Sequence, residues 1–109
     1  MKEIDEIIEK LVKFRDERDW EQFHNSKDLA LAISVEAGEL LELFLWKKAE
    51  DVNKEKLKEE LADILAFSFL LAQKNGLDIK EILLEKFKKN AEKYPIEKAK
   101  GTAKKYDEL

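Results

Sequence analysis

Apolar residues recur along most of the chain three or four positions apart, which is the spacing of one face of an α-helix. The pattern predicts four helices, over about residues 2–18, 27–47, 54–74 and 78–93. In the first of them the apolar positions are Ile4, Ile7, Ile8, Leu11 and Phe14. We therefore expect an all-α fold.

The segments between these helices carry the residues that start and stop a helix. Candidate N-terminal caps stand before three helices, at Asn25 or Ser26, at Asn53, and at Asp78, the last with a capping box to Glu81. Asn75-Gly76 ends the third helix, since glycine readily adopts the left-handed conformation of a helix end. Tyr94-Pro95 ends the fourth. Residues 96–109 then form a tail with a basic middle.

Composition narrows the class of protein. The 109 residues predict one domain, residues 1–109, and the lack of cysteine excludes disulfides and thiolate metal sites. Charged residues make up 42% of the chain, but the net charge is −4, which argues against nucleic acid or an anionic membrane as a partner. Without a secretory leader or a membrane-spanning stretch, we expect a cytoplasmic protein.

Two acidic residues lie on the apolar side of the second expected helix. With about 100° between successive residues, Glu36 falls in the middle of the apolar stripe and Glu39 about 60° away, at its edge. The third helix repeats this arrangement with Glu60 and Asp63. The three-residue spacing of these acids is weak evidence by itself, because 25 acidic residues produce many such pairs by chance. Their position on the apolar face is what separates these two pairs.

Four carboxylates on apolar faces need a strong partner. A buried ionised carboxylate costs several kcal/mol unless it is neutralised, and lysine and arginine are scarce in these stretches. Two pairs on facing helices could offer oxygen ligands to Mg²⁺ or Mn²⁺, with positions open for water and phosphate. The alternatives are that the pairs face solvent or form buried salt bridges.

The two motifs, E-A-G-E at residues 36–39 and E-L-A-D at residues 60–63, resemble the E-x-x-E…E-x-x-D signature of the MazG-like family of all-α nucleotide pyrophosphohydrolases. Further stretches resemble the branch of that family that hydrolyses dCTP: R-D-W-E-Q-F-H (18–24), E-A-G-E-L-L-E-L-F-L-W (36–46), E-E-L-A-D-I-L (59–65) and K-Y-D-E-L (105–109). The resemblance implies a four-helix domain that assembles as a dimer or a dimer of dimers, with the site between subunits.

The resemblance also implies a reaction. Mg²⁺, which Mn²⁺ could replace, would be held by the four acids Glu36, Glu39, Glu60 and Asp63, bridge the triphosphate and acidify a water, releasing a monophosphate and pyrophosphate. A carboxylate such as Glu39 would take the proton. The implied substrate contacts are Trp20, His24, Trp46, Lys86, Asn90, Lys93 and Tyr94. The expected substrate is a nucleoside triphosphate, with dCTP or another pyrimidine deoxynucleotide first.

Two positions depart from the family's dCTP-hydrolysing members, where a histidine stands in place of Leu11 and a tyrosine in place of Phe67. Both changes remove polar contacts near the nucleotide, so a damaged or non-standard nucleotide is a second candidate substrate. Taken alone, His24 could be a half-buried loop residue, and Trp20 and Trp46 could be core or interface aromatics.

Two other classes of protein compete with this interpretation. A non-catalytic helical assembly module would use the buried acids only to fix register. A di-metal redox bundle would need the E-x-x-H pattern of residues 21–24 twice on core helices, and the chain holds one histidine.

Overall fold

The computed structural model describes residues 2–109, and every regular element in them is a helix, which confirms the all-α expectation. The chain divides into two compact units, residues 1–77 and 78–109. Met1 falls within the expected domain but lies outside the described residues. That residues 1–109 act as one domain stays a prediction.

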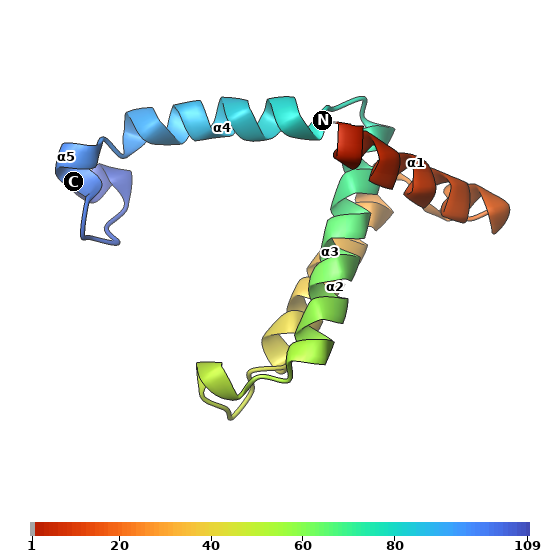
Figure 1. Ribbon diagram of the computed structural model, residues 1–109, viewed down its shortest axis with the longest axis horizontal. Coiled ribbons are helices and arrows are strands. Elements are labelled where there is room, and N and C mark those ends of the chain that lie inside the picture. The colour runs from red at the N-terminus through yellow and green to blue at the C-terminus, as the bar shows by residue number, and fades with distance from the viewer. Residues whose placement is uncertain (1) are drawn as a thin grey trace. The chain divides into compact units, whose positions relative to one another are not determined.

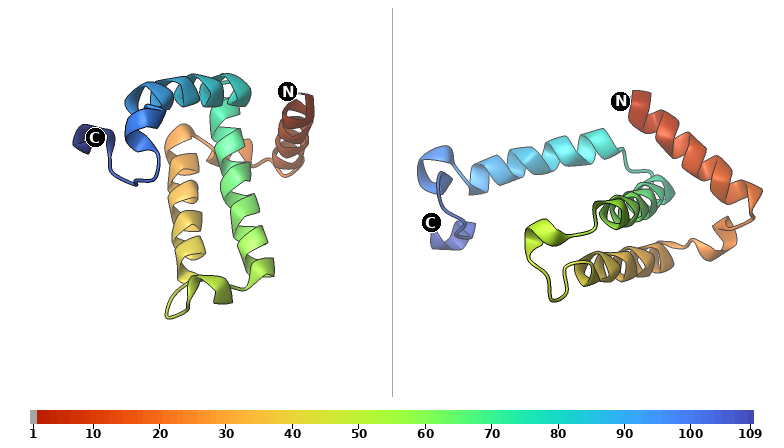
Figure 2. Two further views of the ribbon diagram at one scale, coloured as in Figure 1. Left: turned by 60° about the vertical axis from the view of Figure 1, so that its left-hand side comes forward. Right: turned by 60° about the horizontal axis from the view of Figure 1, so that its bottom comes forward.

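The first unit is built on an antiparallel pair of helices, α2 (Ser26–Glu42) and α3 (Lys54–Lys74) (Figures 1 and 2). The helix α1 (Lys2–Glu17) packs against α3. Two short 3₁₀ turns complete the unit, η1 (Glu21–Phe23) between α1 and α2, and η2 (Ala49–Asp51) between α2 and α3. No helix among the described residues is long and apolar enough to cross a membrane.

The expected caps form. The Asn25 side chain accepts a hydrogen bond of 2.8 Å from the Asp28 N–H, and Asn53 accepts one of 3.1 Å from the Lys56 N–H. Asp78 likewise accepts from the Glu81 N–H at 3.3 Å. Each bond satisfies one of the N–H groups that the first turn of a helix leaves without a partner. These local bonds explain why the helix starts could be placed from the sequence.

Two helices end in the same hydrogen-bonded motif. At the end of α3, Gly76 is left-handed with φ +65°, and the Leu77 N–H donates to the Ala72 carbonyl at 2.9 Å. At the end of α1 the left-handed residue is Asp19, with φ +54°, and the Trp20 N–H donates to the Arg15 carbonyl at 3.0 Å. Both are Schellman motifs.

In the α1 motif, the Trp20 ring also packs edge-on against Phe14, with 5.8 Å between the ring centroids. This is the apolar contact that often accompanies the motif. The backbone thus fixes where Trp20 lies.

The second expected helix ends earlier than the apolar periodicity of its sequence indicates. We expected it to reach about Lys47, whereas α2 ends at Glu42. The N–H groups of Leu43, Phe44 and Leu45 instead bond carbonyls three residues back, as in a tighter turn, and Trp46 is left-handed with φ +61°. The apolar periodicity continues through a segment in which the chain must reverse to reach α3, so periodicity alone placed this boundary wrongly.

The second unit contains more structure than the expected tail. Its main helix is α4 (Ile79–Lys93), followed by the short helix α5 (Ile96–Ala99) and a 3₁₀ turn, η3 (Tyr106–Glu108). Tyr106 packs edge-on against Tyr94, with 6.2 Å between ring centroids, and the Lys93 ammonium lies 4.8 Å from the Tyr106 centroid. These contacts bring the C-terminal turn back onto the end of α4, so residues 96–109, expected only as a tail with a basic middle, contain a short helix and a turn.

Substitutions of Asp19 test the Schellman motif that positions Trp20 at the end of α1. We expect Asp19→Gly to change the free energy of unfolding by less than about 1 kcal/mol, because glycine adopts a positive φ without strain. Asp19→Val should destabilise the protein by about 1–2 kcal/mol, since a β-branched residue is strained there. Urea unfolding of both variants measures the difference, and equal stabilities would contradict this account of the turn.

Candidate metal centre and adjoining cavity

Three of the four acidic side chains singled out on the apolar sides of α2 and α3 meet between these helices. Carboxylate oxygens of Glu36, Glu60 and Asp63 all lie within 4.8 Å of one another. Glu36 and Glu60 are half-buried, whereas Asp63 is exposed. One oxygen of each half-buried acid, Oε2 in both cases, is buried with no hydrogen-bond partner. The site therefore collects negative charge that the neighbouring side chains leave unsatisfied.

The crowding of these acids alters the protonation of Glu36. The pKa of Glu36 is raised to about 7, first because its protonated carboxyl can donate a hydrogen bond to the neighbouring Glu60. Burial also raises this pKa, as do the hydrogen bond and the charge of Glu39. Protonation of Glu36 would therefore remove part of the negative charge that a cation could also neutralise.

The residues present fit a hard divalent cation. Mg²⁺ takes oxygen ligands at about 2.1 Å, so ligand oxygens around one ion lie at most about 4.2 Å apart. The separations within the group need only small side-chain adjustments to reach that limit. The three-residue group found among residues 2–109 does not include Glu39, which is exposed and neighbours Glu36. Its role as a ligand stays a prediction.

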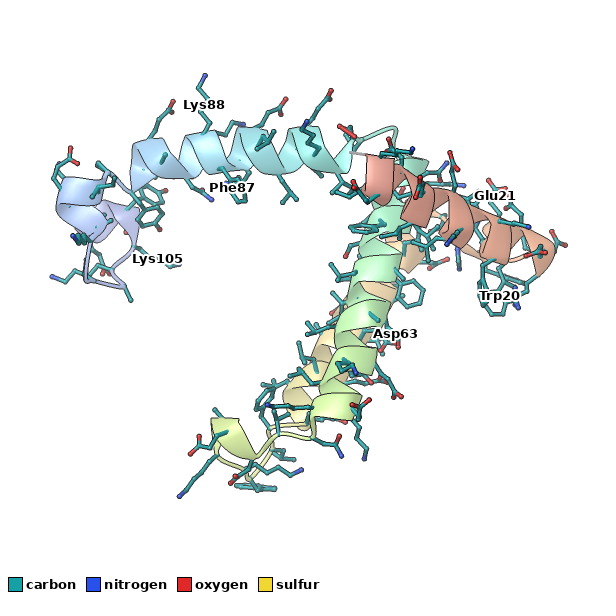
Figure 3. The ribbon with its side chains drawn as sticks, viewed as in Figure 1. Trp20, Glu21, Asp63, Phe87, Lys88 and Lys105 are labelled. Atoms are coloured by element: carbon teal, nitrogen blue, oxygen red, sulfur yellow. The ribbon has the colours of Figure 1, made fainter. Side chains whose placement is uncertain are left out.

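A cavity of about 280 Å³ adjoins the acids, because Asp63, labelled on α3 in Figure 3, belongs to both. Its lining is mainly apolar and comes from α1, the α1–α2 connection and α3: Leu11, Phe14, Arg15, Trp20, His24, Asp63, Ala66, Phe67 and Leu70. The His24 ring packs edge-on against Phe67, with 6.4 Å between centroids. Burial lowers the pKa of His24, and the positive charges of Arg15 and Lys74 lower it further. An aromatic-walled space beside an acidic cluster can hold a flat ring next to a metal ion.

The predicted substrate contacts fall into three groups. Trp20 and His24 line the cavity. Trp46 does not line it; its side chain is 94% exposed in the loop after α2. Lys86, Asn90 and Lys93 belong to the second unit, where their spacing of four and three residues places them on one face of α4, with Tyr94 as its cap.

Arg15 is the cavity residue that the sequence reasoning overlooked. It is 6% exposed, the one polar or charged residue buried in the part of the chain described. A signal was available, because Arg15 stands four residues after Leu11 and seven after Ile8, on the apolar stripe of α1. The test that singled out Glu36 would also have found it.

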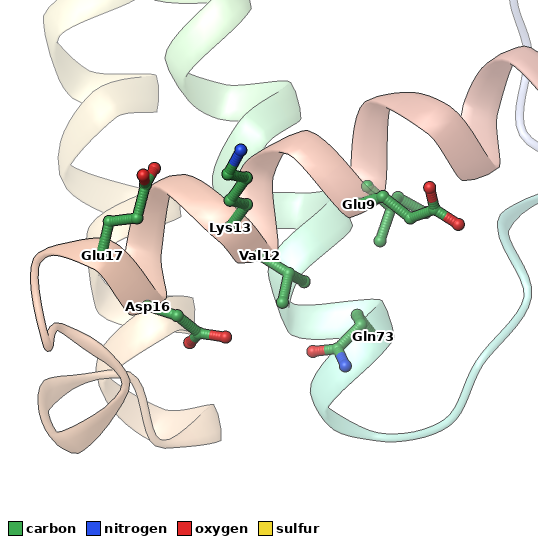
Figure 4. Close-up of a pocket in the computed structure, with 7 residues that line it drawn as sticks. Glu9, Val12, Lys13, Asp16, Glu17 and Gln73 are labelled. Carbon is green, nitrogen blue, oxygen red and sulfur yellow. The ribbon is translucent and has the colours of Figure 1, made fainter.

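A second concavity lies along α1, bounded by one residue of α3 (Figure 4). This groove has a volume of about 520 Å³ and is lined by Ile8, Glu9, Val12, Lys13, Asp16, Glu17 and Gln73. It shares no residue with the carboxylate group or with the cavity of Trp20 and His24. Its charged side chains are one lysine, Lys13, and three acids, Glu9, Asp16 and Glu17, so it offers no cluster of positive charge for a phosphate.

The sequence model of the MazG-like family matches residues 31–109, so this chain belongs to that family and the resemblance seen in its motifs is confirmed. The dCTP pyrophosphatase 1 of Bos taurus is 40% identical over 105 aligned residues, and that of Homo sapiens is 38% identical. Each alignment covers 89% of this chain and 62% of the relative, so the chain spans under two thirds of these relatives. A crystal structure of a pyrophosphatase from Archaeoglobus fulgidus matches with a TM-score of 0.80 and 35% identity, over 85% of this chain and 93% of that one.

The raised pKa of Glu36 predicts how the metal-free protein responds to pH. A carboxyl whose pKa rises from 4.5 to about 7 on folding contributes stability that is complete below pH 4.5 and lost as the pH rises to about 7. We expect thermal unfolding to show this loss, on the order of 1 kcal/mol after solvent screening. Glu36→Gln should flatten the pH profile between 4.5 and 7. A profile equally steep in the variant would show that other groups cause it.

Proposed function

We propose that this protein is a Mg²⁺-dependent nucleoside triphosphate pyrophosphohydrolase. The observation that carries the proposal is the meeting of Glu36, Glu60 and Asp63 oxygens beside an aromatic-walled cavity of about 280 Å³. Membership of the MazG-like family and the 35% identity to a solved pyrophosphatase support the same chemistry. The expected products are a monophosphate and pyrophosphate.

Glu36, Glu60 and Asp63 would hold the cation, and Glu39 is the fourth proposed ligand or the proton acceptor. When bound, Mg²⁺ would neutralise the acids, contact phosphate oxygens and make a water more acidic. Glu39 suits the second role because it is exposed and next to Glu36, so it can reach a water at the edge of the group. Mn²⁺ offers similar oxygen coordination and is the proposed substitute.

The reaction joins the oxygen of one water molecule to the α-phosphorus. The bond from that phosphorus to the oxygen bridging it to the β-phosphate breaks, and pyrophosphate departs with the electron pair. The proton of the water passes to a carboxylate, for which we propose Glu39. The acids thus both hold the cation and accept the proton, and the reaction consumes no other reagent.

The base of the nucleotide would lie in the cavity with Trp20 and His24. Stacking on an aromatic ring is worth about 1–3 kcal/mol per base. dCTP or a related pyrimidine deoxynucleotide is the first candidate, because relatives of 38–40% identity are dCTP pyrophosphatases. The apolar Leu11 and Phe67 in the lining favour testing modified or non-standard bases as well.

We further propose that the working site forms in a homo-oligomer, a dimer or a dimer of dimers. Large apolar side chains stay exposed on α2 and α3, among them Leu31, Val35, Leu41, Leu61 and Leu65. An exposed tryptophan held in a left-handed conformation, as Trp46 is, suits insertion into a neighbouring copy. Lys86, Asn90, Lys93 and Tyr94 are the proposed phosphate and sugar contacts. A solution mass of two or four times the 12.8 kDa of one chain would support the assembly, and a mass of one chain would contradict it.

Pyrophosphate release from a panel of deoxy- and ribonucleoside triphosphates tests the reaction. With Mg²⁺ we expect pyrophosphate rather than single phosphate, and with EDTA we expect none. Glu36→Gln should lower kcat/KM by about 100-fold or more, because it removes a charge that the cation needs. Glu42→Gln, which changes an exposed acid on the same helix, is the matched control and should stay active.

If folded protein cleaves no triphosphate in the panel, the enzyme proposal fails. The acids would then be structural, as in the assembly module considered above, and Mg²⁺ should leave the thermal stability unchanged. If single phosphate appears instead of pyrophosphate, the attack is at the γ-phosphorus and the proposed chemistry is wrong.

A further inference from the structure

Arg15 is a buried charge to which the proposed reaction assigns no role. Its side chain is 7% exposed, and a charge taken out of water costs several kcal/mol unless hydrogen bonds and opposite charges compensate. Nε donates a hydrogen bond of 2.9 Å to Asp16, which lies at 51% exposure beside it. That single neighbour does not require the guanidinium to point inward. The other contacts of Arg15 explain its position.

The remaining contacts of Arg15 reach other elements around the cavity. Nη1 donates to Oε1 of Gln73 on α3 at 3.5 Å, and Nη2 lies 3.8 Å from Oε2 of Glu21 on η1. The Lys74 ammonium lies 3.6 Å from the other oxygen of Glu21. Glu21 is therefore held from α1 and from α3 at once. Because η1 lies between Trp20 and His24 in the chain, this network fixes the segment that carries both residues.

The backbone of Arg15 holds the first of these residues directly. Its carbonyl accepts the Trp20 N–H at 3.0 Å, in the motif that ends α1. Arg15 also lines the cavity beside Trp20 and His24. The main chain of Arg15 thus holds Trp20 in the cavity wall. Its side chain contacts Glu21 in the turn that follows.

We propose that Arg15 is a positioning residue for recognition of the base: its guanidinium locks the turn between α1 and α2, so that Trp20 and His24 keep their places in the cavity wall. This inference rests on the proposed function, in which the base occupies that cavity. The contact of Arg15 is with the turn, and no contact with the substrate is needed.

The charges around His24 give the network a second consequence. Arg15 and Lys74 are positive, whereas Glu21 and Asp63 are the acids of the turn and of the cavity lining. Burial and the two positive charges keep the pKa of His24 below its ordinary value of 6.5. A neutral imidazole has one donor and one acceptor nitrogen, so it can contact either kind of group on a base edge.

Arg15→Gln tests the proposal, because it removes the charge and the fork of donors while leaving an amide of similar reach. With the substrate that the wild type prefers, we expect KM to rise about fivefold to tenfold and kcat to change by less than about twofold. The ratio of kcat/KM between the best and the worst base of the panel should fall. Since the chain holds one histidine, NMR reports the pKa of His24 as a single signal, and it should rise toward 6.5.

Two further variants separate this role from a general loss of folding. Lys13→Gln removes the same charge from an exposed position of α1, on the groove of Figure 4, and should leave KM and the His24 signal unchanged. Arg15→Lys keeps the positive charge but loses the planar set of guanidinium N–H donors. We therefore expect KM to rise while the pKa of His24 stays low. Circular dichroism verifies that each variant is helical.

An unchanged KM and base preference in folded Arg15→Gln would overturn the proposal, as would a fall in kcat with KM unchanged. If Arg15→Gln does not fold, Arg15→Lys decides by the same comparison. If the wild type cleaves no triphosphate, the proposed function fails, and the proposal for Arg15, which rests on it, fails with it.

Discussion

Mutual repulsion of acidic side chains across the α2–α3 pair is the constraint on which the rest of the first unit depends. Glu36 and Glu60 face each other from the apolar sides of two helices, each with one oxygen buried and without a partner. The hydrogen bond that a protonated Glu36 can donate to Glu60, together with burial and neighbouring charge, raises the pKa of Glu36 to about 7, so protonation can relieve part of this repulsion. If the acids hold the proposed cation, the stability lost to their repulsion is a cost of that function.

The remainder of the first unit arranges an apolar space beside these charges. The Schellman motif at Asp19 sets Trp20 against Phe14, and Phe67 supports the ring of His24. Asp63 belongs both to the acidic group and to the cavity lining, so whatever occupies the cavity lies next to the proposed cation site. This proximity of a flat apolar space and concentrated negative charge matches a nucleotide whose phosphates bind through a metal ion.

Helix positions, caps and the acids on apolar stripes could be predicted because each depends on residues a few positions apart. Asn25, Asn53 and Asp78 cap their helices by bonds to the N–H three residues on, and Glu36 and Glu60 stand out by their position on the apolar stripe of a helix. The end of α2 could not be placed, because the reversal at Trp46 depends on where α3 lies. Arg15 was missed because arginine on an apolar stripe is easily read as solvent-exposed, and its partners Glu21 and Gln73 come from other elements.

The central claim is that these acids form a cation site, and the most direct measurement is the anomalous scattering of Mn²⁺ in crystals of the protein. The account predicts a peak about 2.1–2.2 Å from carboxylate oxygens of Glu36, Glu60 and Asp63. The peak should vanish in Glu60→Gln crystals grown with the same ion. An empty site in the wild type at saturating Mn²⁺, with the three carboxylates still close together, would contradict the claim.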